Sequence, residues 1–373
     1  MSRASRPPAS VVVDCSGVGA GGITRVLTEL VRHWPAAWRL RIVAAPSSWD
    51  VPSEHAAALE IVSRQQGGRA GTIASAAAAL WRATGRAPDG AGVVLSLSPS
   101  AAMLGSRLPV VTVLHDLAFK LWPHDLPSTV RQYRRASYAA AIRRSERLLC
   151  VSARTQHDLL GLYGVPPERA RIWHPGSDLT VLPGGLPEPL ARIRQRGERY
   201  LLVAGHAAHK GVELAVDALP ELPEYALVVL TGGQPVDRFR EVAERSTARD
   251  RILMLERLPD AGYAAALADA AVFLMPSHFE GYGLPAAEAL RVGTPTVVSP
   301  DPALHEATGG RAVRMTSWSA RSLVAAVRAA EQAPRPAVGQ GGRSWQEATA
   351  DLVALLDGAS SDDRRPVPAG AGG

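Results

Sequence analysis

The sequence predicts an α/β protein of two doubly wound, Rossmann-like domains that face each other across a cleft. Short apolar runs alternate with helical stretches along the chain, a pattern typical of parallel sheets covered by helices. A segment rich in proline and glycine, residues 182–187, interrupts this rhythm and separates two such series. With 373 residues, of which 46% are hydrophobic, the chain is long enough to bury two cores.

Each element is predicted from an apolar run or a helical stretch bounded by turn residues. In the first series we expect strands at 11–15, 39–44, 92–97, 110–114 and 148–152, and helices at 22–33, 70–84, 128–144 and 153–163. In the second we expect strands at 200–204, 226–230, 252–254, 272–275 and 296–298, and helices at 212–219, 236–245, 260–268, 284–292 and 319–331. An amphipathic helix at 345–356 then precedes a tail rich in glycine, proline, serine and charge. Because open α/β sheets bind ligands at the carboxyl ends of their strands, motifs that follow a strand are candidate sites.

The bulk composition narrows the class of protein. The formal net charge of +6 fits polyanionic small ligands, and no nucleic-acid-binding motif is recognisable. No apolar stretch approaches the roughly 20 residues that span a bilayer, and residues 1–10 contain no signal-peptide core. Cys15 and Cys150 adjoin apolar strands without a Cys/His cluster nearby, so we expect buried reduced thiols, no zinc site and a cytoplasmic protein.

The most informative motif is the segment 277–290, in which seven residues separate Glu280 from Glu288. It follows an apolar strand, so Glu280 is expected on a strand-to-helix loop and Glu288 on the next helix. The glycines between them free backbone N–H groups at a helix N-terminus, which suits a diphosphate, while the carboxylates can accept hydroxyl hydrogens. The alternative is a helix cap and a solvated glutamate, but the whole string favours a nucleotide-sugar site.

A glycine-rich loop at 16–23 follows the first strand. Gly17, Gly19 and Gly22 have the spacing of a dinucleotide fingerprint, but no acidic residue ends the strand at 39–44, so the sequence gives NAD little support. A tight strand-to-helix turn is the alternative interpretation.

Two further strand ends carry cationic or titratable side chains. His115, followed by Asp116, ends the apolar run 110–114, which favours a functional histidine over a core or surface filler. Lys210 lies in the strand-to-helix turn 205–211, where a lysine can contact phosphate oxygens as a point charge; the alternative is a solvated lysine.

A basic helix is expected at 128–144. Its arginines could contact an anionic acceptor or give a weak peripheral membrane contact, although a solvated helix face is the commoner case. The arginines in and just after this helix are Arg131, Arg134, Arg135, Arg143, Arg144 and Arg147.

The segment 276–295 resembles the Glu-x7-Glu signature of retaining glycosyltransferases of family 4, which have the GT-B fold. The resemblance runs from about residue 11 to 356 and is nearest in impression to the mannosyl- and rhamnosyl-transferring branch. It implies an N-terminal Rossmann-like, acceptor-side domain at 1–183 and a C-terminal, nucleotide-sugar-binding domain at 184–343. A helix at 344–357 would cross back to the first domain, and 358–373 would be a disordered tail.

The resemblance also implies an activity: retaining, metal-independent transfer of a hexosyl or deoxyhexosyl group from a nucleotide-diphosphate sugar to an acceptor hydroxyl. The acceptor would be a natural product, a saccharide or a lipid-linked molecule, and no further cofactor is implied. The residues that match family positions are Glu280 and His115 as catalytic groups, and Gly21, Gly22, His209, Lys210, Tyr282, Gly283, Leu284 and Glu288 as donor-binding groups.

One departure from the family pattern keeps other functions open. His209 stands where an arginine is usual, and histidine is a weaker, pH-dependent cation. A nucleotide-sugar epimerase, or a catalytically weakened nucleotide-sugar-binding protein of the same fold, is therefore an alternative.

Overall fold

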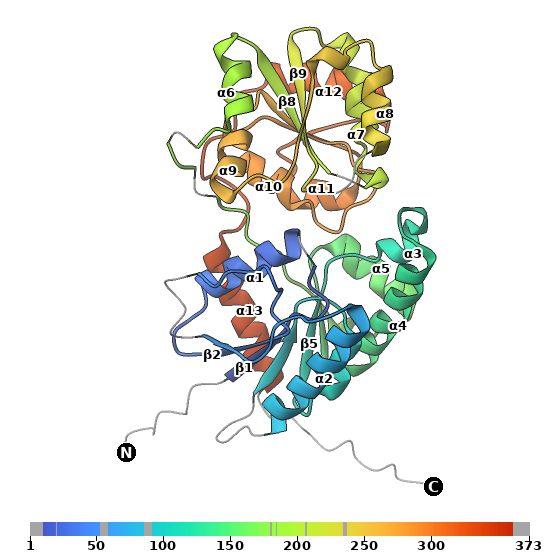
Figure 1. Ribbon diagram of the computed structural model, residues 1–373, viewed down its shortest axis with the longest axis vertical. Helices are drawn as coiled ribbons and strands as arrows, with labels where there is room; N and C mark the ends of the chain where they lie inside the picture. Colours follow the sequence, from blue (N-terminus) through green and yellow to red (C-terminus); the bar gives the residue numbers. More distant parts are fainter. Residues whose placement is uncertain are drawn as a thin grey trace. The chain divides into compact units, whose positions relative to one another are not determined.

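The computed structural model describes residues 10–19, 21–52, 59–85, 92–179, 181–183, 185–205, 207–233 and 237–360. Two parallel sheets carry the fold, a seven-stranded sheet of order β3-β2-β1-β4-β5-β6-β7 and a six-stranded sheet of order β10-β9-β8-β11-β12-β13. In both, the chain starts near the middle of the sheet and winds outward on each side (Figure 1). This is the doubly wound architecture that the alternating pattern predicts.

The strands are short and apolar. Those of the first sheet are β1 (Ser10–Asp14), β2 (Arg39–Val43), β3 (Leu59–Ile61), β4 (Val93–Ser96), β5 (Val110–Leu114), β6 (Arg147–Cys150) and β7 (Ala170–Ile172). Those of the second are β8 (Arg199–Ala204), β9 (Tyr225–Leu230), β10 (Ile252–Leu255), β11 (Val272–Met275), β12 (Thr296–Val298) and β13 (Val313–Arg314).

The helices connect these strands. They are α1 (Gly22–Arg32), α2 (Arg69–Gly85), α3 (Ala118–Leu121), α4 (Ser128–Arg144), α5 (Ala153–Tyr163), α6 (Glu188–Gln195), α7 (Val212–Ala218), α8 (Asp237–Arg245), α9 (Asp260–Asp269), α10 (Leu284–Arg291), α11 (Pro302–Ala307), α12 (Ala320–Gln332) and α13 (Trp345–Ser360). Two short 3-10 turns matter below, η3 (Pro123–Asp125) and η5 (Ala208–Lys210).

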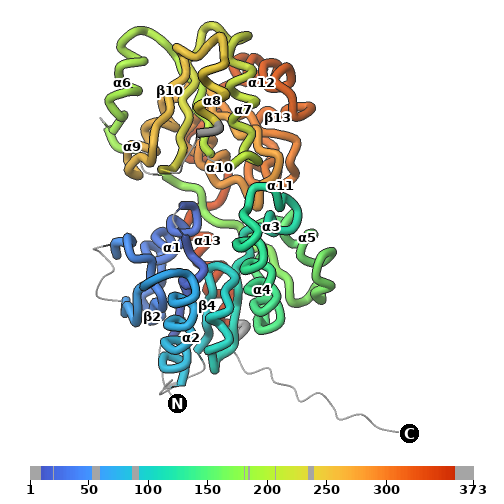
Figure 2. Tube along the Cα trace, turned by 45° about the vertical axis from the view of Figure 1, so that its right-hand side comes forward, coloured from blue at the N-terminus to red at the C-terminus, as the bar shows by residue number. Residues whose placement is uncertain are grey.

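The chain packs into two compact units. Unit 1 contains residues 1–113, 136–149 and 349–373, and unit 2 contains 114–135 and 150–348. Both views show α13 running among the N-terminal elements of unit 1 (Figures 1 and 2), where the Arg147 guanidinium donates to the Leu355 carbonyl at 2.9 Å. The domain boundaries predicted from the sequence, at residues 183, 343 and 357, stay predictions.

The second sheet separates two apolar cores. Because side chains alternate along a strand, Leu201 and Val203 of β8 face a core covered by α7, α8 and α12, whereas Tyr200 and Leu202 face one covered by α6, α9 and α10. Figure 1 shows these helix sets on opposite sides of β8 and β9. A strand buried on both faces has a continuous apolar sequence, and for this reason β8 and β9 could be predicted.

The fold class predicted from the sequence is confirmed, with differences in short elements. Every predicted strand and helix that falls on described residues is found within a few residues of its expected position. The prediction missed β3, β7 and β13, which are two or three residues long, and the helices α3, α6 and α11. It expected the last helix to end by 357, but α13 runs to Ser360; the rest of the predicted tail, 361–373, lies outside the described residues.

Both cysteines are buried thiols, as expected. Burial, with Asp14 as a second cause, raises the pKa of Cys15 well above its ordinary value, and burial raises that of Cys150 to about 12. Neither thiol is therefore a nucleophile at neutral pH.

Candidate functional site

Two of the predicted site residues, Glu280 and Lys210, are in direct contact. Glu280 follows β11 and Lys210 follows β8, and these strands are neighbours in the sheet, so their carboxyl ends meet. The Lys210 Nζ lies 2.8 and 2.9 Å from the two carboxylate oxygens of Glu280. The Glu280 side chain is 8% exposed and that of Lys210 25% exposed. A carboxylate and an ammonium thus lie side by side at the carboxyl ends of two inner strands.

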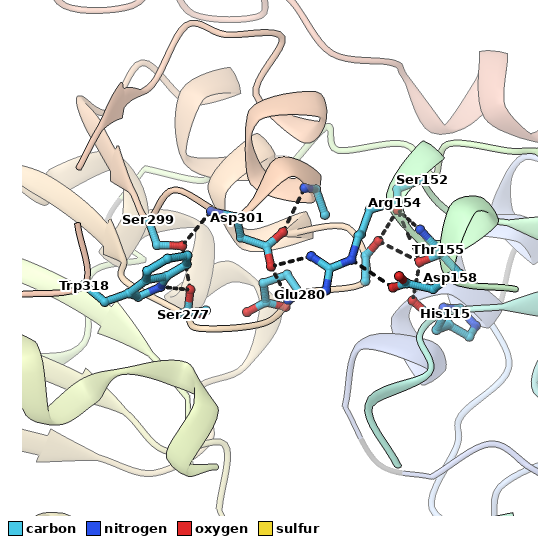
Figure 3. A network of polar contacts seen from close by, with 12 residues as sticks. His115, Ser152, Arg154, Thr155, Asp158, Ser277, Glu280, Ser299, Asp301 and Trp318 are labelled. Carbon is cyan, nitrogen blue, oxygen red and sulfur yellow. Dashed lines mark hydrogen bonds and ion pairs between the residues drawn. The ribbon is translucent and has the colours of Figure 1, made fainter. Parts of the chain in front are cut away.

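Asp301, which follows β12, fixes the main chain of Glu280. Its Oδ2 accepts from the Glu280 amide at 3.2 Å and from the Arg154 guanidinium at 3.3 Å (Figure 3). Its Oδ1 accepts from the Ala303 amide at 2.8 Å and so caps α11. Burial raises the pKa of Asp301, although the Ala303 amide and the Arg154 charge oppose this shift.

His115 lies against the Glu280 loop through its main chain. A Cβ built on Gly281 would come within 1.7 Å of the His115 carbonyl oxygen, so only glycine fits there. The Ser152 and Thr155 hydroxyls donate to the Gly281 carbonyl at 2.6 and 3.2 Å, which joins the N-terminus of α5 to the same loop (Figure 3). His115 and Glu280 belong to one compact unit and their loops touch, while their catalytic roles stay predictions.

The predicted phosphate amides lie at the start of α10. Gly283 precedes this helix with φ +105°, which an L side chain rarely adopts, and a Cβ there would meet Leu304 at 2.3 Å. The amides of Gly283 and Leu284 are therefore at the positive end of an eight-residue helix.

Glu288 is more buried than the sequence indicates. The sequence predicts a carboxylate that can accept hydroxyl hydrogens of a ligand, but Glu288 is 1% exposed, and its Oε2 accepts from the Tyr263 hydroxyl at 2.8 Å. Tyr263 is on α9, so the carboxylate joins α9 to α10. Its predicted ribose contact stays a prediction.

Tyr282 stacks on His174, which in turn contacts Glu306. Its ring stacks on His174 with centroids 5.6 Å apart, and the His174 Nε2 lies 2.6 Å from a Glu306 oxygen. Glu306 also accepts from the Ala153 amide at the start of α5. Burial raises the pKa of Tyr282 to about 12, so its hydroxyl stays protonated at neutral pH.

His209 is engaged by a residue that the sequence analysis did not find. The Oδ2 of Asp125 lies 2.9 Å from the His209 amide and 2.5 Å from its Nδ1. No pattern in the sequence connects two residues 84 positions apart. Asp301 and Arg154 were also missed as site residues, although Asp301 follows a strand and could have been found by that rule.

Gly21 and Gly22 lie in unit 1, at the start of α1, and are not part of the cluster in unit 2. Gly21 has φ +120°, and a Cβ built on either glycine meets nothing within 4 Å. Packing within the described chain therefore does not explain these two glycines.

The described ranges lack a cluster of metal ligands and a membrane-spanning helix. They contain no group of three or more His, Cys, Asp or Glu side chains that could hold a metal ion. Among these same residues, no helix has the length and apolar character needed to cross a membrane.

Comparisons with known proteins agree with this architecture. The model described as Glycosyltransferase Family 4 matches residues 20–181, and the model described as Glycosyl transferases group 1 matches residues 191–333. Together they match most of the chain, which therefore belongs to glycosyltransferase family 4 and has the GT-B fold. The predicted resemblance is confirmed.

Individual relatives are more distant. A D-inositol 3-phosphate glycosyltransferase of Xylanimonas cellulosilytica is 30% identical over 224 residues, 54% of this chain and 53% of its own length. An MMP alpha-(1->4)-mannosyltransferase of Mycolicibacterium hassiacum is 30% identical over 228 residues, 56% of this chain and 53% of its own. The chain thus spans about half the length of the curated relatives it matches. The structure of Anabaena HepE in complex with UDP and glucose has a TM-score of 0.70 at 15% identity, covering 94% of this chain and 100% of that one, and shows the shared fold.

Proposed function

We propose that the protein is a glycosyltransferase. It transfers a hexosyl or deoxyhexosyl group from a nucleotide-diphosphate sugar to an acceptor hydroxyl, with retention of anomeric configuration and without a metal ion. The observation that carries the proposal is the contact between Lys210 and Glu280, 2.8 and 2.9 Å across the ends of neighbouring strands. Family membership and the names of the two relatives support it.

The Lys210–Glu280 pair matches what the bond to be broken requires. A glycosyl phosphate has a sugar that becomes positive and a diphosphate that becomes negative as the bond between C1 and oxygen lengthens. Glu280 would accept from donor-sugar hydroxyls and stabilise the cationic sugar, while Lys210 and the amides of Gly283 and Leu284 would offset the charge on the diphosphate. Preorganised charges of this kind are often the largest catalytic contribution.

The remaining residues have supporting roles in the proposal. His115 would lie against the donor sugar, and Glu288 would take the ribose hydroxyls. Gly21 and Gly22 would cover the donor phosphates. We place the enzyme in the cytoplasm because its two described thiols are buried and free.

A catalytically weakened nucleotide-sugar-binding protein is the alternative that an observation favours. The imidazole of His209, in the place where an arginine is usual, is engaged by Asp125. Such a protein would bind nucleotide sugars without turning them over. A nucleotide-sugar epimerase of the same fold would change the donor itself and leave no glycosylated acceptor.

One experiment separates these functions. The protein is screened by thermal shift against UDP, GDP and dTDP sugars, where a ligand at 100 times its Kd adds about 2.7 kcal/mol of stability. The stabilising donor is then incubated with candidate acceptors in excess EDTA, and the products are analysed by proton NMR. We expect an acceptor glycoside with the donor's anomeric configuration. An inverted product, or a requirement for metal, would contradict the proposed mechanism, and binding without turnover would support the weakened protein.

A further inference from the structure

Asp125 forms an acid–histidine pair with His209, the residue immediately before Lys210. One carboxylate oxygen, Oδ2, accepts from both the main-chain N–H and the Nδ1 of His209. The side chains are 11% and 17% exposed, so solvent screens the pair only in part. Two bonds to one residue fix both the position and the rotation of the imidazole.

A second set of contacts holds the same two residues together. The Trp122 side chain donates a hydrogen bond to Asp125, and its ring stacks on His278 with centroids 5.4 Å apart and planes 17° apart. The His278 amide donates to the His209 carbonyl at 2.7 Å. The imidazole of His278 also stacks on Trp318, with centroids 5.9 Å apart. The turn that carries Asp125 is thus joined to the loop that carries His209 through Trp122 and His278.

The hydrogen bond to Asp125 decides whether the Nε2 of His209 is a hydrogen-bond donor or an acceptor. Burial raises the pKa of Asp125, but hydrogen bonds from the His209 amide and ring outweigh it, so this pKa lies below its usual value. Asp125 is therefore an anion at neutral pH and keeps a proton on Nδ1. No described residue bonds to Nε2. A protonated ring presents there a cationic N–H, and a neutral ring presents a lone pair that repels phosphate oxygens.

We propose that Asp125 is a positioning residue that holds His209 so that its Nε2–H binds the diphosphate of the nucleotide sugar only when the ring is protonated. This inference rests on the proposed function and adds a pH-dependent second cation beside Lys210. As the bond between C1 and the phosphate oxygen breaks, its electron pair stays on the diphosphate, and the imidazolium offsets the added charge. The glycosyl carbon bonds to the acceptor oxygen, whose proton passes to a phosphate oxygen.

Other ionisable groups of the described residues lie near this pair, and His124 adjoins Asp125 on η3. Lys210 follows His209 on η5 and is held by Glu280. His278, on the loop after β11, has a pKa lowered chiefly by burial, so it is neutral at pH 7. Glu213 on α7 interacts with His278 and contributes negative charge. The Asp125 carboxylate is the anion that bonds directly to the ring of His209.

The test measures the Kd of UDP and of GDP by calorimetry from about pH 5.5 to 8.5 for the wild type, Asp125→Asn, His209→Gln and His209→Arg. The phosphate also titrates in this range, so each Kd is divided by that of His209→Arg at the same pH. For the wild type we expect a ratio near one at the acidic end that rises about tenfold or more at the alkaline end. For Asp125→Asn we expect weaker binding at the acidic end and a smaller rise in the ratio, because the amide oxygen can still accept from both N–H groups but carries no charge to favour the protonated ring. His209→Gln should give a flat ratio, which keeps the test valid if Asp125→Asn does not fold.

One variant is a control, and three outcomes would contradict the inference. Trp122→Phe keeps the stack on His278 but removes the indole N–H, and it should retain most of the wild-type pH dependence. Tighter binding by Asp125→Asn at every pH would overturn the inference, since Asp125 would then occupy the phosphate site instead of preparing it. A flat ratio for the wild type would exclude a phosphate contact by His209. If neither the wild type nor His209→Arg binds UDP or GDP in this titration, or dTDP in a repeat of it, the proposed function itself fails, and the inference fails with it.

Discussion

The glycines after β1 and the glycines after β11 are used for different reasons. Added Cβ atoms at Gly19, Gly21 or Gly22 meet nothing within 4 Å, whereas at Gly281 and Gly283 they would meet other atoms at 1.7 and 2.3 Å. The second loop therefore has no room for side chains. In the first loop Gly17 is also tight, 2.9 Å from the Ser98 carbonyl oxygen, but Gly19, Gly21 and Gly22 have no packing partner and leave space beside the backbone that a ligand could occupy. Similar glycine-rich strings in one sequence can thus carry a packing constraint in one place and an open surface in another.

The largest effect that tests this contrast is expected for Gly281→Ala. The new methyl group would collide with the main-chain carbonyl of His115, which cannot move without shifting β5. We expect a loss of stability of about 1–3 kcal/mol or more, seen in the thermal midpoint and in urea unfolding. Gly19→Ala is the matched control and should change stability by less than about 0.5 kcal/mol. Equal midpoints for the two variants would contradict a packing constraint at Gly281.

A second experiment asks whether the packed loop also carries chemistry. Glu280→Gln and His115→Ala should each lower turnover by about 10²–10³ while changing nucleotide affinity much less, because their proposed contacts are to the sugar. Steady-state kinetics and nucleotide calorimetry measure the two quantities. Glu256→Gln, at an exposed position, is the control. Equal losses in turnover and in nucleotide affinity would place these side chains on the nucleotide instead.

A smaller effect is expected at Glu288, whose carboxylate bonds to Tyr263 and is proposed to bind the ribose as well. Glu288→Gln can still accept from Tyr263, so the fold should be retained while UDP or GDP affinity falls about tenfold through loss of a charged hydrogen bond. Tyr263→Phe removes the structural bond alone. It should lower stability by about 1 kcal/mol and leave the nucleotide affinity nearly unchanged. The ribose assignment is wrong if Glu288→Gln binds both nucleotides as the wild type does.

The smallest structural effect, and the one that sharpens the contrast, is expected for Gly22→Ala. Alanine suits the first position of α1, so stability should stay within about 0.5 kcal/mol of the wild type. Turnover should nevertheless fall, because the methyl group would enter space that the donor is proposed to use. Unchanged turnover would mean that this loop does not approach the donor.

The sequence predicted what depends on local pattern. β5, α4 and α5 have the expected ends, because each is a long apolar or helical run with clear boundaries. β13 has two residues, too few for any periodicity, and its strand geometry comes from pairing with β12. The contact between Asp125 and His209 also joins residues far apart in the chain, and no residue near Asp125 in the sequence indicates it. Glu288 was located correctly on its helix, but its burial depends on α9 and could not be deduced from the spacing.

The division of the chain has a consequence for its synthesis. Unit 1 is assembled from three separate stretches, the last of which begins at residue 349, whereas every residue of unit 2 precedes that point. On the ribosome, where domains generally fold as they emerge, the N-terminal half would have to wait for the final helix. Leu352 and Leu356 of that helix are fully buried, so until they arrive the apolar surface that they cover is exposed to water and to other chains. Loss of α13 to a premature stop codon should therefore cause aggregation of the first half of the protein, although the stop lies far downstream of β1.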